Sequence, residues 1–171
     1  RGAGWTIQRD DALFPRITQT AKALWLTYMG LTAVAVVALR LAGMGWFDAL
    51  CHGFSVVALG GFSTRDASIG AFDSVAIEAV LIVLMLVATL NFSRHFMALR
   101  GRTLAPYRSD SEAKVIFALV GASVLAIAVL LTMRGTFPDF FGALRHAAFN
   151  VVSVATTTGF ASDDYGLWPI F

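Results

Sequence analysis

The sequence predicts an all-α integral membrane fold built from repeated units, each a span, a re-entrant pore helix with its loop, and a second span. Only 14% of the 171 residues are charged, against about 25% in soluble domains. Three apolar stretches are long enough to cross a bilayer, and two shorter ones break at glycine. The first residue is arginine and the last lies in an apolar stretch, so we expect an internal fragment of a longer chain.

The three predicted spans cover about residues 20–42, 71–92 and 113–133. A helix needs about 20 apolar residues to cross the hydrocarbon core, and all three stretches approach that length. The second span is the weakest, because Asp73 and Glu78 lie near its start. We expect this helix to be tilted or partly buried in protein.

Two further apolar stretches, residues 46–64 and 140–162, are too short to cross a bilayer. The first breaks at Gly60-Gly61, and the second ends in a Thr-Thr-Thr-Gly run. Each predicts a pore helix of about three turns followed by an irregular polar loop. Irregular backbone at membrane depth is tolerated only inside protein or beside water, so two such loops indicate a water-filled path.

These elements divide the chain into a cytoplasmic linker, a complete repeat, a cytoplasmic loop and the start of a further repeat, at residues 1–19, 20–99, 100–112 and 113–171. The N-terminal segment and the segment after the second span hold nine Lys and Arg residues, against four elsewhere. The positive-inside rule makes the first two segments cytoplasmic, so both short loops enter from outside.

The external segments carry a net charge of −3 and the internal segments +5. A negative outer mouth concentrates cations, because field lines focus in a low-dielectric vestibule. Asp163 and Asp164 follow the second glycine-containing loop and are candidates for an outer ring that attracts cations. The alternative is that these carboxylates only solvate a loop.

The two loops can be aligned with each other. Gly61 and Phe62 match Gly159 and Phe160 at an offset of 98 residues. The preceding helices share the pattern Phe-x-Ala-Leu-x-His, but at an offset of 94. The four-residue mismatch is about one helical turn. Repeats of this kind place ion sites near the middle of the bilayer, at the interface between repeats.

The loops have the chemistry of a dehydrated-cation site. Backbone carbonyls can replace the water around an alkali cation if the chain is extended and its oxygens point inward. Glycine reaches the unusual φ and ψ angles that this geometry needs, and Gly60-Gly61 and Thr158-Gly159 supply it. The hydroxyls of Thr156, Thr157 and Thr158 either add ligands or hold the loop in shape. Each half-helix would direct the negative end of its dipole at the ion.

Three segments resemble the membrane subunit of Trk-type bacterial potassium uptake systems, in the wider Trk/Ktr/HKT superfamily. They are Gly60-Gly61-Phe62-Ser63-Thr64-Arg65-Asp66-Ala67-Ser68-Ile69-Gly70, Ala155-Thr156-Thr157-Thr158-Gly159-Phe160 and Asn91-Phe92-Ser93-Arg94-His95-Phe96. The resemblance covers nearly the whole chain from about residue 15. Arg65 departs from it, because members of the family often have His at this position.

The resemblance implies four potassium-channel-like pseudo-repeats around one pore, of which this chain holds the second and the start of the third. It implies that potassium crosses the bacterial inner membrane without any bound cofactor or metal other than K⁺ itself. By position, the potassium-binding filter loops are Leu59, Gly60, Gly61 and Phe62, and Thr157, Thr158, Gly159 and Phe160, supported by Ala58 and Thr156. Leu59, Gly60, Thr157 and Thr158 would offer carbonyl oxygens.

The resemblance also implies several partners. These are the lipid bilayer, the first and fourth repeats of the same polypeptide, a second copy in a homodimer, and a cytosolic nucleotide-binding regulatory subunit. Nucleic acid is not expected. The family's gating loop and fourth filter would lie beyond residue 171.

The remaining polar residues have simpler interpretations. His52 and His146 lie at matching places in the two half-helices, where orienting the helix is a simpler role than binding metal or moving protons. Asp48 is expected as an N-terminal cap or dipole partner. His95 is expected as a surface or inter-helix contact, and Cys51 as a small packed residue.

Three other functions remain open at this stage. A protein of this fold could carry sodium, or couple the ion to protons or sodium. An intramembrane hydrolase would use Ser55 or Ser63 with His52, although neither serine lies in a Gly-x-Ser-x-Gly elbow. A scaffold without transport activity would have no reason to break its helices in lipid.

Overall fold

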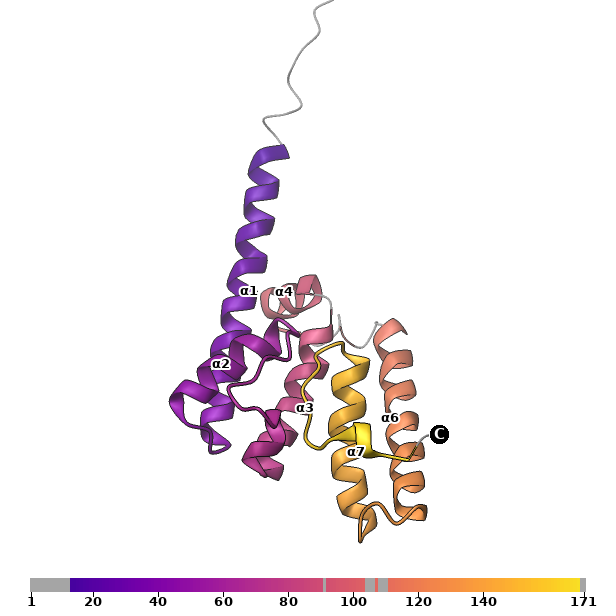
Figure 1. Cartoon of the computed structure of the whole chain (residues 1–171). Coiled ribbons are helices and arrows are strands. Elements are labelled where there is room, and N and C mark those ends of the chain that lie inside the picture. The colour runs from indigo at the N-terminus through magenta and orange to yellow at the C-terminus, as the bar shows by residue number, and fades with distance from the viewer. Residues whose placement is uncertain (1–12, 91, 104–106, 108–110, 170–171) are drawn as a thin grey trace, which may run out of the picture.

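The computed structural model describes residues 13–90, 92–103, 107 and 111–169, and within them every regular element is a helix. Figure 1 shows α1 projecting beyond the other helices, with α3 between it and the pair formed by α6 and α7. The helices are α1 (Leu13–Leu41), α2 (Trp46–Val57), α3 (Val75–Thr89), α4 (Phe92–Gly101), α6 (Ser111–Met133) and α7 (Phe140–Ala155), with short 3₁₀ helices at Ser68–Phe72 and Tyr165–Leu167.

Two helices are long and apolar enough to cross a membrane, at Thr18–Leu41 and Ala113–Met133. The expected middle span is shorter than residues 71–92. A 3₁₀ helix precedes it, Ser74 caps α3 by accepting a hydrogen bond from the Ile77 N–H, and Leu90 is already extended. The 15 residues of α3 cover about 22 Å at the usual rise per residue.

α1 and α6 end in the same way. In α1, the N–H of Gly43 donates to Arg40 at 3.2 Å, and the N–H of Met44 donates to Leu39 at 3.1 Å. Gly43 has a φ of +109°, which is the left-handed residue of a Schellman motif. α6 repeats these two hydrogen bonds 92 residues later, around Gly135 with a φ of +69°. Each long helix therefore stops at a glycine and leads by a short connection into a half-helix.

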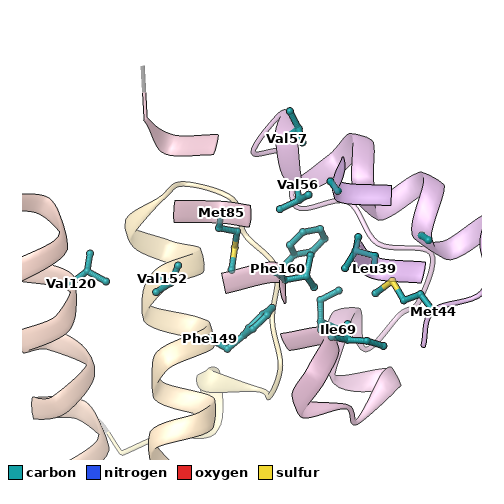
Figure 2. Packing of buried hydrophobic residues seen from close by; sticks show 14 residues of the cluster. Leu39, Met44, Val56, Val57, Ile69, Met85, Val120, Phe149, Val152 and Phe160 are labelled. Carbon is teal, nitrogen blue, oxygen red and sulfur yellow. The ribbon is translucent and has the colours of Figure 1, made fainter. Parts of the chain in front are cut away.

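The main core lies where α1, α2, α3 and α7 meet (Figure 2). Phe160, from the loop after α7, points into this core near Val56 and Leu39 and is only 1% exposed. Burying a phenylalanine side chain is worth about 1.5–3 kcal/mol, so this contact holds the C-terminal loop against the first half of the chain. α6 and α7 pack through small residues, including Ala128, Ala143 and Ala147, which allow close approach.

His95 in α4 makes the inter-helix contact expected of it. Its Nε2 lies 3.0 Å from the Val87 carbonyl oxygen at the end of α3, and its Nδ1 lies 2.8 Å from the Tyr107 hydroxyl. Burial lowers the pKa of the imidazole below its usual value. The contact fixes α4 to the end of α3.

Candidate functional site

The two half-helices α2 and α7 end with the same three backbone hydrogen bonds. In α2, the N–H groups of Ala58, Leu59 and Gly60 donate to Phe54, Val56 and Ser55 at 2.8–3.1 Å. In α7, the N–H groups of Thr156, Thr157 and Thr158 donate to Val152, Val154 and Ser153 at 2.9–3.0 Å. Every donor and acceptor in the second set lies 98 residues after its counterpart. The offset that aligns the loops also aligns these hydrogen bonds.

Both loops contain a second shared feature, a pair of residues with positive φ. Leu59 and Gly61 have φ of +51° and +67°, and Thr157 and Gly159 have φ of +59° and +91°. Leucine and threonine carry a steric penalty in this region, about 1–2 kcal/mol per residue. Such strain is often found at functional sites. The sequence assigned the unusual backbone to glycine alone and gave no sign that Leu59 and Thr157 share it.

The two loops lie directly against each other. A Cβ atom added to Gly61 would overlap the carbonyl oxygen of Thr158 and come within 3.0 Å of the carbonyl carbon of Gly159. A Cβ atom added to Gly159 would meet nothing within 4 Å. Close backbone approach therefore makes glycine necessary at Gly61, whereas only the backbone angle favours it at Gly159.

A second backbone contact joins the loops beyond the glycines. The N–H groups of Ile69 and Gly70 both donate to the carbonyl oxygen of Ala161, at 3.0 and 3.1 Å. The Ala161 N–H in turn donates to the Ser68 hydroxyl at 3.2 Å. The segment after the second glycine-containing loop is thus held by the segment after the first.

Side chains from α2 anchor the first loop. The Thr64 hydroxyl donates to Asp48 at 2.6 Å, and Arg65 donates to the other oxygen of Asp48 at 2.9 Å. Both hydrogen bonds hold the pKa of the Asp48 carboxyl below its usual value, and the hydrogen bond from Thr64 has the larger effect. His52 Nε2 lies 2.9 Å from the Ser63 hydroxyl. Asp48 is not the N-cap of α2, which is Gly45, but it lies in the first turn, where a carboxylate interacts favourably with the helix dipole as expected. Its hydrogen bonds also hold the first loop.

α7 anchors the second loop with different residues at the same places. His146 Nδ1 lies 3.1 Å from the Ser162 hydroxyl, and Asn150 exchanges hydrogen bonds of 3.2 Å with the Ser162 hydroxyl and N–H. In the 98-residue register, His146 corresponds to Asp48 and Asn150 corresponds to His52. His52 and His146 therefore correspond only when α2 and α7 are aligned by their first residues. α7 has 16 residues and α2 has 12, and the additional turn accounts for the two offsets.

The threonine hydroxyls behind the second loop hold its shape. Thr156 Oγ1 donates to the Val152 carbonyl oxygen at 2.8 Å and lies 2.8 Å from Thr158 Oγ1. Both side chains are buried, at 4% and 3% exposure. Of the two interpretations of these hydroxyls, the structure supports loop stabilisation for Thr156 and Thr158.

The predicted outer carboxylates have local partners. Asp163 accepts a hydrogen bond from the Trp168 indole N–H at 3.0 Å, and Asp164 accepts one from the Gly166 N–H at 3.0 Å. Both lie directly after the loop. Within the described residues no group of three His, Cys, Asp or Glu side chains could hold a metal ion.

Serine and histidine do meet in the site, as the hydrolase alternative requires. Ser63 lies against His52, but its hydroxyl also accepts the Arg65 N–H at 3.1 Å, and His52 Nδ1 faces the backbone oxygen of Asp48 at 2.7 Å. The buried Ser55 hydroxyl has no hydrogen-bond partner within the described part of the chain. The Ser63–His52 contact is part of the loop anchor.

Two long apolar helices, and two half-helix loops in contact with each other, are typical of a helical membrane protein of the transport class. Residues 6–137 match the family TrkH, described as cation transport protein, and the chain belongs to this family. It is 48% identical to the Trk system potassium uptake protein TrkH of Halomonas elongata over 94% of the chain and 33% of that relative. It is 40% identical to the TrkH of Escherichia coli K12 over 95% of the chain and 34% of that relative.

The fold agrees with this membership. The crystal structure of the potassium transporter TrkH from Vibrio parahaemolyticus superposes with a TM-score of 0.85 and 41% sequence identity, covering 91% of this chain and 34% of that one. The predicted all-α membrane fold and the predicted family are confirmed. The relatives are transporters and not enzymes, which removes the hydrolase alternative. The chain spans about a third of the length of these relatives.

Proposed function

We propose that this chain contributes two filter loops to a protein that carries potassium across the bacterial inner membrane. The observation that carries the proposal is the pair of loops, equivalent in hydrogen bonds and φ angles and packed together at Gly61 and Thr158. Relatives that are 40–48% identical to this chain over the aligned residues are named as potassium uptake proteins. The carbonyl oxygens of Leu59, Gly60, Thr157 and Thr158 are the proposed ligands.

The hydrogen bonds at the helix ends explain how such ligands become available. The hydrogen bonds that end α2 and α7 include the pair that defines a Schellman motif, with Leu59 and Thr157 as its left-handed residues. The motif turns the chain sharply, so the residues after it leave the helix axis. The partial negative charge of the helix C-terminus lies at the same place and favours a cation there. Rings of carbonyl oxygens then replace the water shell of the ion. Gly61 and Gly159, with Phe62 and Phe160 beside them, shape the loops, while Ala58 and Thr156 lie at the helix ends.

We infer that the chain comprises a complete second repeat and the start of a third. α1 and α3 would be the spans of the second, and α6 the first span of the third. α1 and α6 carry many exposed apolar side chains, among them Trp25, Val34 and Leu119 at 61–68% exposure. Surfaces of this kind fit lipid or the missing repeats.

The orientation and the partners belong to the same proposal. The excess of Lys and Arg at residues 1–22 and 94–114 favours a cytoplasmic location for these segments, with the loops entered from outside. Asp163 and Asp164 would then face the outer mouth and attract cations. A homodimer and a cytosolic nucleotide-binding subunit complete the assembly that the resemblance implies.

The test uses the complete transporter that contains this chain, expressed in bacteria that lack their own potassium uptake. Potassium uptake and its inhibition by sodium are measured for the wild type and for Gly61→Ser and Gly159→Ser. Both replacements should weaken discrimination between potassium and sodium, because the added side chain disturbs the carbonyl positions. Gly121→Ser is the control, since Gly121 lies within helix α6 with free space around it. Unchanged selectivity in both loop variants would contradict the proposal.

A further inference from the structure

Arg145 forms an ion pair that lies outside the two loops and their anchoring side chains. Its Nε and Nη2 atoms donate to the two oxygens of Glu78, each at 2.9 Å. Nη2 also donates to Asp73 at 3.0 Å. Arg145 lies in α7, whereas Glu78 lies in the first turn of α3. The ion pair therefore links the half-helix of one proposed repeat to the second span of the repeat before it.

Glu78 requires this partner. Its side chain is buried, with 2% of the residue exposed, although it is a carboxylate in an otherwise apolar helix. A buried carboxylate is very unfavourable unless a charged, hydrogen-bonded partner compensates it. The planar guanidinium of arginine matches both carboxylate oxygens at once, which the ammonium group of lysine cannot do. The two hydrogen bonds therefore fix both the orientation of α7 relative to α3 and the distance between the two helices at this point.

The pair is not part of the internal repeat. When α2 and α7 are aligned by their first residues, at an offset of 94, Arg145 corresponds to Cys51. When they are aligned by their loops, at an offset of 98, it corresponds to Phe47. Neither residue can form an ion pair. The contact thus acts on the second loop alone and adds an attachment that the first half-helix lacks.

A change at the Arg145 ion pair can move the loop at the far end of α7. α7 continues for ten residues beyond Arg145, about 15 Å, and then ends in the loop. At the far side of the loop, Ala161 is bonded to Ile69 and Gly70. The loop end of α7 is thus fixed to the preceding repeat by the Ala161 hydrogen bonds and by buried Phe160, whereas Arg145 fixes the helix nearer its start. If the ion pair is released, the helix can tilt about its loop end, and the backbone oxygens before Gly159 move.

We propose that Arg145 is a positioning residue for ion passage, which sets the placement of the Thr157–Thr158 carbonyl oxygens by holding α7 against Glu78. The residue does not touch the ion. The inference rests on the proposed function, because it concerns the same loops. It assigns a role in selectivity to an ion pair that lies outside them.

The experiment measures potassium uptake and its inhibition by sodium in the complete transporter, normalised to the amount of protein in the membrane. Arg145→Gln should raise the potassium concentration for half-maximal uptake, or the inhibition by sodium, about fivefold or more, the lower end of couplings between linked elements. Arg145→Lys keeps the charge but loses the two-pronged contact and should fall between wild type and Arg145→Gln. Arg134→Gln, at an exposed arginine just after α6, is the control and should leave both values unchanged.

A double variant separates positioning from simple instability. Glu78→Gln with Arg145→Gln leaves no buried unpaired charge, so this protein should reach the membrane in normal amounts. Because the two residues act as one unit, its selectivity loss should not exceed that of Arg145→Gln alone. Wild-type selectivity in the double variant, or a loss of protein with no change in selectivity, would overturn the inference. Absence of potassium uptake by the wild type would instead overturn the proposed function.

Discussion

The Cα atom of Gly61 faces the carbonyl oxygen of Thr158 so closely that no side-chain atom fits between them. The two residues are separated by 97 positions in the sequence and belong to the ends of two different half-helices. Through this contact the backbones of the two loops pack directly against each other. A carbonyl oxygen proposed to bind the ion is therefore held in place by a glycine of the other loop.

The contact predicts unequal effects of alanine at the two glycines. Gly61→Ala combines the left-handed backbone penalty with an overlap against backbone atoms, which cannot rotate away as a side chain can. Gly159→Ala has free space and carries only the backbone penalty, about 1–2 kcal/mol. Gly61→Ala should therefore lower the melting temperature of the purified transporter more than Gly159→Ala does. Equal losses would show that the loops do not touch as described.

The strained residues before each glycine give a prediction of the opposite sign. Leu59 and Thr157 have φ of +51° and +59°, and glycine adopts these angles without penalty. Leu59→Gly and Thr157→Gly should stabilise the folded loops by up to about 1 kcal/mol, after the added freedom of the unfolded chain is subtracted. Melting temperature is the measurement, and Thr136→Gly, at an exposed position between α6 and α7, is the comparison variant. A marked loss of stability in both loop variants would show that these side chains matter more than the strain.

The Asp48 anchor predicts a dependence on pH. Because Thr64 and Arg65 hold the pKa of the folded carboxyl below its ordinary value of 3.8, the anchor stabilises the fold fully above that pH and is lost as the pH falls further. Asp48→Ala should lower stability by about 1 kcal/mol at neutral pH, mostly through the hydrogen bond, since Arg65 is 53% exposed. Thermal melts of wild type and Asp48→Ala should differ by a constant amount from pH 8 down to about pH 4, and should converge only as the pH falls further through the lowered pKa of the folded carboxyl. A constant difference at every pH would exclude the carboxylate as the cause.

The elements that follow from local pattern could be predicted from the sequence. The breaks at Gly60-Gly61 and Thr158-Gly159 predicted where both half-helices end, because glycine and apolar length are properties of the residues themselves. The four-residue difference between the two repeat offsets predicted a helical turn of mismatch, and α7 is one turn longer than α2.

What depends on distant partners could not be predicted. Leu59 and Thr157 look like ordinary helix-end residues, and only the hydrogen bonds of the folded loop show their left-handed backbone. Glu78 lowered the apolar character of its span and indicated a weak helix. Its partner Arg145 lies 67 residues away, so no local pattern connects them. The alignment of His52 with His146 followed the helix starts, whereas the loop contacts follow the helix ends.

The replacement of His52 by Asn150 in the second loop shows how the role of the histidine can be tested. Both side chains lie at the same place in the 98-residue register, and both bond to a serine of the following segment, Ser63 or Ser162. If His52 only orients the loop, His52→Asn should keep uptake within about twofold of wild type, whereas His52→Ala should lose more, because the hydroxyl of Ser63 then has no partner on α2. The pH profile of uptake between about pH 5 and 8, where an imidazole titrates, should be the same in wild type and His52→Asn. An asparagine cannot carry a proton at these pH values, so a flattened profile in His52→Asn would assign His52 a proton-transfer role that the hydrogen bonds alone do not require. Uptake as low as that of His52→Ala, with an unchanged profile, would show that asparagine does not replace the hydrogen bonds of His52 at this position.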